Sequence, residues 1–137
     1  MKIRKTKRIL TFILSFCLAI NPAVVDVFYR DGGSIRYTNS VTFYGQPAWG
    51  TIHYRDLSIR IASDAPDTTL AHEMGHYLYH RQVWSGELQD MANKAFAQSP
   101  LQECNDENFA IGYAMYCERG LGGALGEFYQ EIETKLF

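Results

Sequence analysis

The spacing of apolar residues changes about halfway along the chain. Between residues 24 and 62 they alternate with polar residues or form short β-favouring runs, and after residue 68 they recur at steps of three and four. Alternation is typical of strands with one buried face, whereas steps of three and four are typical of amphipathic helices. A β-rich half followed by an α-rich half predicts an α+β fold.

The N-terminal half predicts three short strands. The runs that favour β structure are Val24–Tyr29, Ser34–Tyr44 and Thr51–Ala62. The third is the clearest, because Leu57, Ile59 and Ile61 would share one face of a strand. Turns that contain glycine separate the runs, so we expect a small, largely antiparallel sheet.

The C-terminal half predicts four helices. The first begins at Asp67 or Asp64, whose carboxylates can cap a helix, and it stops at Ser85-Gly86. The other three span residues 87–98, 106–119 and 125–137, each with an apolar stripe at helical spacing.

The first of these helices contains two histidines four residues apart. The sequence His72-Glu73-Met74-Gly75-His76 places both imidazoles on one face, one turn apart, where they can bind a single cation. A Zn²⁺ ion held by two histidines needs a third protein ligand and keeps one position for water. His80, one turn further on, is more typical of a structural or partly exposed residue.

The third ligand should be a glutamate on a later segment that packs across the motif helix. The candidates are Glu87, Glu103, Glu107, Glu118 and Glu127. Glu107 has the best surroundings, because its helix carries Ala110, Gly112 and Ala114, which allow another helix to approach closely. It also follows His76 by 31 residues, enough for one intervening helix and two loops.

The chain resembles the gluzincin metallopeptidases, in particular the branch of anthrax lethal factor-like enzymes and Pro-Pro endopeptidases. The resemblance lies in His72-Glu73-Met74-Gly75-His76 and in Glu107-Asn108-Phe109-Ala110, and it covers roughly residues 50–137. It implies a zincin-type helical half with one Zn²⁺ ion per chain, held by His72, His76 and Glu107. It also implies that Glu73 is the general base.

Two positions depart from that branch. Ile111 stands where a carboxylate usually orients the first histidine, and Pro100 stands where a tyrosine usually stabilises the oxyanion. A neighbouring register, with Glu103 as ligand and Glu107 as the orienting carboxylate, removes the first departure but loses the match to Phe109-Ala110. We favour Glu107 and keep Glu103 as the alternative.

The reaction implied by the resemblance is hydrolysis of a peptide bond in a peptide or protein substrate. Zinc lowers the pKa of its bound water, and Glu73 would take the proton and pass it to the leaving amine. Strand 51–62 is the candidate edge for pairing with the substrate. The candidate oxyanion donors are Tyr113, Tyr116 and His53. The alternative function is a catalytically inactive zinc-binding or interaction module of the same fold.

The chain opens with a basic segment followed by an apolar one. Five of the Lys and Arg residues lie within the first eight positions, and the apolar run Ile9–Ile20 follows. That run is shorter than the roughly 20 residues of a membrane span and is typical of a secretory signal peptide. We expect a signal peptide in residues 1–23, cut between Ala19 and Asp26, and a secreted metallopeptidase domain in 24–137. The alternative is an uncleaved membrane anchor with the domain facing outside.

The charge of the remaining chain argues against one class of partner. All fifteen Asp and Glu residues follow the basic segment, so residues 23–137 carry a net charge of −7. Binding to phosphates needs a basic surface, so we expect no nucleic-acid partner.

Two cysteines, Cys104 and Cys117, lie in the second half of the chain. If the segment between them is helical, it separates them by about 20 Å, which is too far for a disulfide. We therefore expect both to remain thiols.

Overall fold

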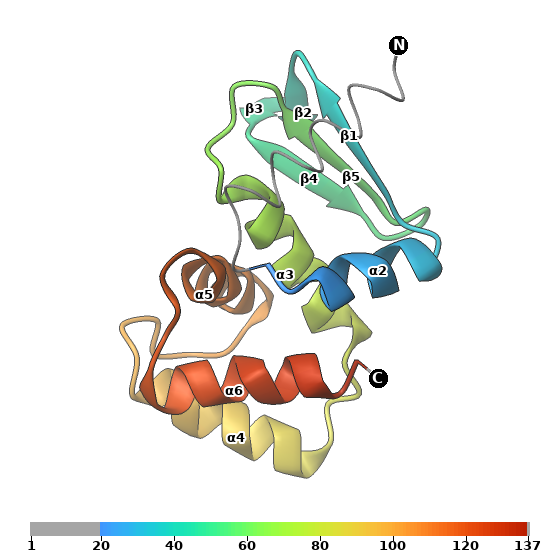
Figure 1. Ribbon diagram of the computed structural model, residues 1–137. Coiled ribbons are helices and arrows are strands. Elements are labelled where there is room, and N and C mark those ends of the chain that lie inside the picture. The colour runs from blue at the N-terminus through green and yellow to red at the C-terminus, as the bar shows by residue number, and fades with distance from the viewer. Residues whose placement is uncertain (1–19, 137) are drawn as a thin grey trace.

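The computed structural model describes residues 20–136, in which a small β-rich part is followed by helices (Figure 1). The strands are β1 (Ser34–Thr38), β2 (Val41–Phe43), β3 (Gln46–Ala48), β4 (Gly50–His53) and β5 (Ser58–Ala62). The helices are α2 (Pro22–Arg30), α3 (Thr69–Arg81), α4 (Gly86–Ala97), α5 (Asp106–Arg119) and α6 (Gly123–Thr134). The predicted α+β class is confirmed. Residues 1–19 of the expected signal peptide lie outside the described residues. Its last residues are described, because Asn21 caps α2 and Pro22 and Ala23 belong to that helix.

Helix α2 corrects the prediction of a strand at Val24–Tyr29. The side chain of Asn21 caps the helix by accepting a hydrogen bond from the backbone N–H of Ala23 at 3.0 Å, and Pro22 occupies the first turn. Both features favour a helix start. Val24, Val27 and Phe28 then lie at helical spacing and are buried. The capping signal and this spacing outweigh the β preference of the valines.

The main sheet has the order β1-β5-β4 and contains both kinds of pairing. Strands β4 and β5 are antiparallel, but β1 runs parallel to β5, with Ile35 opposite Ile59, so the expected largely antiparallel sheet is mixed. The pair β1–β5 is parallel because the chain crosses over through β2, β3 and β4 before it returns. Strands β2 and β3 form a separate antiparallel pair.

The predicted strand 51–62 is a hairpin instead of one continuous strand. Residues 54–57 form the turn between β4 and β5, and Leu57 has a positive φ of 50°. Asp56 stabilises the turn, because its Oδ1 accepts hydrogen bonds from the N–H and the hydroxyl of Ser58 at 3.1 and 2.8 Å. Ile59 and Ile61 face the core as predicted. The hairpin leaves β4 at one edge of the three-stranded sheet.

Helix α3 lies between the sheet and helices α4 and α6, with α5 and α2 beside it (Figure 1). Phe28 of α2 packs edge-on against Tyr77 of α3 with ring centroids 5.0 Å apart. On another side of α3, a Cβ added at Gly75 would lie 2.7 Å from the Cα of Ala110. Gly75 therefore allows α3 and α5 to touch through their backbones, which is the close approach expected from the small residues of the α5 segment.

Two further observations concern the remaining sequence predictions. Cys104 and Cys117 are not joined by a disulfide, as expected, and α5 fills most of the segment between them. Within residues 20–136, none of the helices has both the length and the apolar character needed to cross a membrane.

Candidate metal centre

The two histidines of the motif lie on one face of α3. His72 and His76 are one turn apart, their ring centroids are 4.8 Å apart, and their Nε2 atoms are 3.2 Å apart. The helix begins at Thr69, two residues after the predicted start, and ends at Arg81, before the predicted stop. Neither difference moves the histidines away from the predicted geometry.

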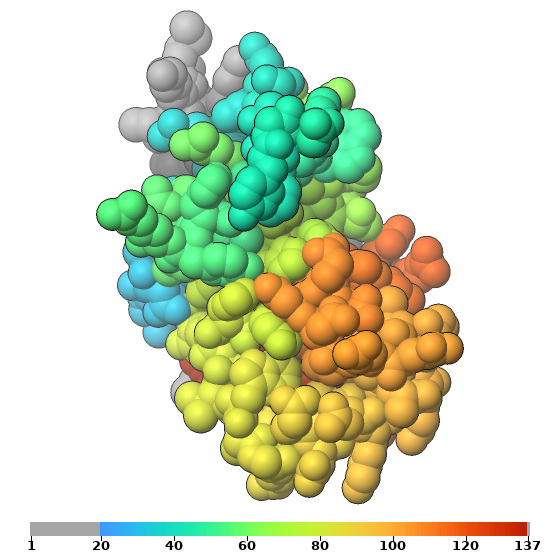
Figure 2. Space-filling model, turned by 180° about the vertical axis from the view of Figure 1, so that it is seen from behind, coloured from blue at the N-terminus to red at the C-terminus, as the bar shows by residue number. Residues whose placement is uncertain are grey.

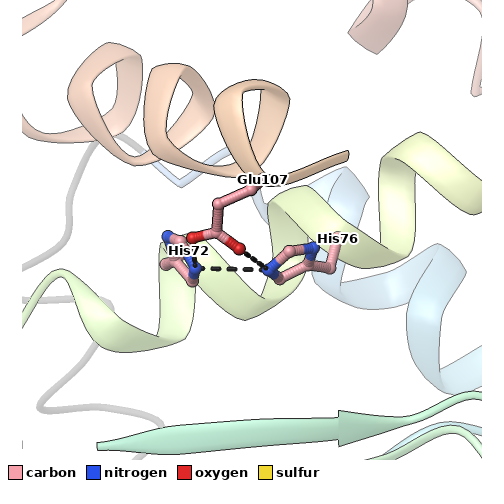
Figure 3. A group of neighbouring side chains, drawn as sticks. All are labelled: His72, His76 and Glu107. Atoms are coloured by element: carbon pink, nitrogen blue, oxygen red, sulfur yellow. Dashed lines mark hydrogen bonds and ion pairs between the residues drawn. The ribbon is translucent and has the colours of Figure 1, made fainter. Parts of the chain in front are cut away.

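Helix α5 supplies the third group. Asn105 caps this helix by accepting a hydrogen bond from the N–H of Asn108 at 2.8 Å, which places Glu107 in the first turn. From there the carboxylate of Glu107 reaches both imidazoles (Figure 3): Oε1 lies 3.1 Å from Nε2 of His72, and Oε2 lies 3.3 Å from Nε2 of His76. The three side chains form the group that could hold a metal ion among the described residues.

The structure therefore brings Glu107, and not Glu103, to the histidines. Glu103 is exposed in the segment before α5, and its backbone carbonyl accepts a hydrogen bond from the side-chain amide of Asn108 at 2.9 Å. Glu118, another candidate, lies near the C-terminal end of the same helix.

The donor atoms are of the kind, and lie close enough together, to hold one metal ion. Two imidazole nitrogens and a carboxylate oxygen are common zinc ligands, and a tetrahedral ion bonded to each at about 2.0–2.1 Å would separate the donor atoms by about 3.3 Å. The observed separations between Nε2 of His72, Nε2 of His76 and the nearer oxygens of Glu107 are 3.1 to 3.3 Å. The side chain of Glu107 is 61% exposed, so the site also opens to water.

Asp106 orients the second histidine, a role that the sequence analysis missed. Its Oδ1 lies 2.7 Å from Nδ1 of His76, and its Oδ2 lies 2.7 Å from Nε2 of His80. Burial raises the pKa of Asp106, but the hydrogen bonds with the two histidines outweigh it and hold the pKa below its usual range. The carboxylate is therefore ionised and accepts a hydrogen bond from Nδ1–H of His76, which leaves Nε2 with a lone pair for a metal.

Glu73 lies beside the two histidines and is buried. Only 5% of the residue is exposed, and burial raises the pKa of its carboxyl to about 7, with the charge of His76 acting in the opposite direction. A carboxyl group with a pKa near neutrality can both accept and release a proton, as a general base must. Burial likewise lowers the pKa of His72, which favours the neutral, metal-binding imidazole.

Two of the three residues predicted as oxyanion donors, Tyr113 and Tyr116, are directed away from the metal centre. Tyr113 and Tyr116 donate hydrogen bonds to Glu133 of α6, each at 3.1 Å, which directs their hydroxyls toward that helix. Tyr54, in the turn after β4, is a further candidate oxyanion donor that the sequence analysis missed. Its ring stacks on His80 with centroids 4.1 Å apart. Burial and the charges of Asp106, Glu73 and Glu107 raise the pKa of Tyr54, so its hydroxyl stays neutral and keeps a proton to donate.

A pocket of about 450 Å³ adjoins His72 and Glu73. Trp49 and Gly50 line it from the sheet, and Ile111, Ala114 and Met115 line it from α5. Figure 2 shows the orange surface of the start of α5 beside the yellow-green surface of α3, below the teal and green surface of the strands.

The chain matches no protein-family model, and it shows no detectable similarity to a curated protein or to a solved structure. What the site can do therefore follows from its own residues.

Proposed function

We propose that the protein is a zinc-dependent endopeptidase that hydrolyses peptide bonds at an ion held by His72, His76 and Glu107. The observation that carries this proposal is the mutual spacing of the three donor groups, 3.1 to 3.3 Å, with Glu73 next to them on α3. The order of these parts along the chain agrees with the gluzincin resemblance.

Each residue has a distinct part in the proposed reaction. A zinc ion supplies Lewis acidity and lowers the pKa of a bound water. Asp106 holds the ring of His76 in the tautomer that leaves Nε2 available. Glu73 takes the proton of the attacking water and delivers it to the leaving amine. The hydroxyl of Tyr54 donates a hydrogen bond to the carbonyl oxygen as negative charge develops on it.

The first experiment measures the metal content of the purified protein. We expect one zinc ion per chain in the wild type, none in Glu107→Ala, and an unchanged content in Glu103→Ala. The same proteins are then assayed with a mixture of unstructured peptides, where Glu73→Gln should retain zinc and lose hydrolysis. A wild-type protein that binds no zinc would end the peptidase proposal.

The purified protein should begin at Ile20. This residue is 1% exposed, and the cap of α2 comes from the next residue, Asn21. A chain that begins at residue 24 would lack both, and α2 would lose its first turn.

A catalytically inactive zinc-binding module is the second candidate. One observation favours it: apart from Glu107, no carboxylate within residues 20–136 pairs with His72, whereas His76 has Asp106. Metal-binding histidines in enzymes are usually oriented by such a partner. The Glu73→Gln comparison separates the two functions, because in the module it would change neither zinc content nor any activity.

We also propose that the protein is secreted after removal of its N-terminal segment. Cleavage directly before Ile20 falls within the predicted range and would keep α2 complete. Expression of the full-length chain in a secreting host, followed by mass measurement of the protein in the medium, tests this. A full-length mass in the membrane fraction would support the anchored alternative.

A further inference from the structure

The pocket beside His72 and Glu73 is placed to receive part of a substrate. Both residues line it, so a group inside the pocket lies next to the position where Glu73 would activate water. Its volume of about 450 Å³ is within the range of about 300–1,000 Å³ that is typical of ligand sites.

The walls of the pocket are mainly apolar. Ile111, Ala114 and Met115 form the α5 side, and Trp49, whose residue surface is 53% exposed, stands on the sheet side. The sheet side also lacks charge, since no Asp, Glu, Lys or Arg occurs between Arg36 and Arg55. An apolar group that covers the exposed surface of Trp49 removes apolar area from water, which favours its binding.

A carboxylate at the edge of the pocket does not change this character. Glu118 lines the pocket, but half of its side chain is exposed, and Nε of Arg119 lies 3.8 Å from its Oε2. Water and the neighbouring cation weaken its attraction for a second cation. The pocket therefore favours an apolar side chain over a lysine or arginine.

We propose that this pocket selects a large apolar side chain, such as phenylalanine, on the substrate residue next to the scissile bond. This inference rests on the proposed function, because the pocket acquires its meaning from the metal centre that adjoins it. Ala114 and Met115 line the pocket from α5, so we expect their size to limit the largest side chain that fits.

Binding is measured with end-blocked heptapeptides of Ala and Gly that carry one central Phe, homophenylalanine, Ala or Lys. Zinc-loaded Glu73→Gln protein prevents turnover. In a Trp84→Phe background Trp49 is the single tryptophan, so its fluorescence reports occupancy of the pocket. We expect the Phe peptide to bind about 10- to 100-fold more tightly than the Ala peptide.

Two variants test the walls in opposite directions. Ala114→Leu narrows the pocket and should reduce the preference for Phe over Ala about 10-fold or more. Met115→Ala widens it and should favour homophenylalanine over Phe. Ala97→Leu is the matched control, because Ala97 is exposed on α4, and it should leave both preferences unchanged.

The outcomes separate the pocket from the proposed reaction. If the preference for Phe shifts in both variants, the assignment of the pocket is supported. If, in addition, the active protein hydrolyses none of the peptides, only the peptidase proposal fails. Hydrolysis whose preferences do not respond to either variant overturns the pocket assignment and leaves the peptidase proposal standing. Tightest binding of the Lys peptide, or no binding of any peptide, also overturns the proposal.

Discussion

The carboxylate of Asp106 joins two histidines that lie one turn apart on α3, because its Oδ1 is 2.7 Å from Nδ1 of His76 and its Oδ2 is 2.7 Å from Nε2 of His80. His80 is thus tied to the metal centre without being a ligand. Its ring in turn supports Tyr54. One residue at the start of α5 therefore orients a candidate metal ligand, His76, and, through His80, the loop that follows β4.

Replacing Asp106 should weaken metal binding without removing a ligand. In Asp106→Ala the ring of His76 loses the acceptor that fixes its tautomer, and we expect zinc affinity to fall about 10- to 100-fold. Competition with a chromogenic chelator measures the change. Glu103→Ala is the control, because Glu103 is also a carboxylate close to the start of α5, but it touches neither His76 nor His80. Equal affinities in the two variants would mean that Asp106 has no orienting role.

The contact between α3 and α5 predicts an unusual response to alanine. Gly75→Ala improves helix propensity by about 1 kcal/mol, but its Cβ would lie 2.7 Å from the Cα of Ala110. Overpacking of this kind costs about 1–3 kcal/mol, so we expect a net loss of about 1 kcal/mol in the free energy of unfolding. Denaturant unfolding of the metal-free proteins measures it.

Gly86→Ala is the matched control for that substitution. Gly86 is the first residue of α4, and a Cβ added there would meet no atom within 4 Å. Alanine at Gly86 should therefore be neutral or stabilising. A gain in stability at both glycines would show that α3 and α5 can separate without cost.

The parts of the site that were predictable from sequence are those set by local spacing. Four residues on a helix bring His72 and His76 to one face wherever that helix packs, and Asn105 marks the helix start that presents Glu107. The role of Asp106 could not be predicted in the same way. It depends on how α5 crosses α3, and the sequence shows that only as small residues that permit a close contact.

The errors in the sheet have a similar origin. Val24–Tyr29 was read from β preference alone, although Asn21-Pro22 before it is a helix start and Val24 and Phe28 are four residues apart. The parallel pairing of β1 with β5 joins strands that are separated by three others, which alternation within a strand cannot reveal. Tyr54 was missed because it lies in a turn inside what was read as one continuous strand.

Removing the hydroxyl of Tyr54 should affect turnover more than binding. In Tyr54→Phe the ring can still stack on His80, but no donor remains for the developing oxyanion, and we expect kcat to fall about 100-fold or more. KM and zinc content should stay close to the wild-type values. Tyr44→Phe serves as the control, because Tyr44 is 90% exposed in the β2–β3 turn. An unchanged kcat in Tyr54→Phe would exclude Tyr54 as the oxyanion donor.

Glu133 of α6 predicts a pH dependence of stability that is independent of the metal centre. It is 7% exposed and accepts hydrogen bonds from Tyr113 and Tyr116, each at 3.1 Å. Burial raises its pKa, and the hydrogen bonds from these tyrosines and from Asn21 only partly oppose the shift. Because the folded pKa is above the unfolded one, the unfolded chain releases this proton first as pH rises. Ionisation of Glu133 therefore lowers stability from about pH 4.3, the ordinary glutamate pKa, up through its raised folded value.

The comparison of Glu133→Gln with Glu133→Leu tests both the charge and the hydrogen bonds. Glutamine keeps an acceptor for the tyrosines and removes the titration, so the stability of Glu133→Gln should rise relative to the wild type as pH rises above about 4.3. Leucine removes the carboxylate that accepts from the buried hydroxyl of Tyr113 and leaves only the weaker sulfur acceptor of Cys117, so Glu133→Leu should be about 1–3 kcal/mol less stable than Glu133→Gln at every pH. Denaturant unfolding at a series of pH values measures both effects. The titration of the other ionisable groups is common to all the proteins and cancels when their free energies of unfolding are subtracted. A wild type that gains stability over Glu133→Gln as pH rises would show that the tyrosine hydrogen bonds, and not burial, dominate the pKa of Glu133.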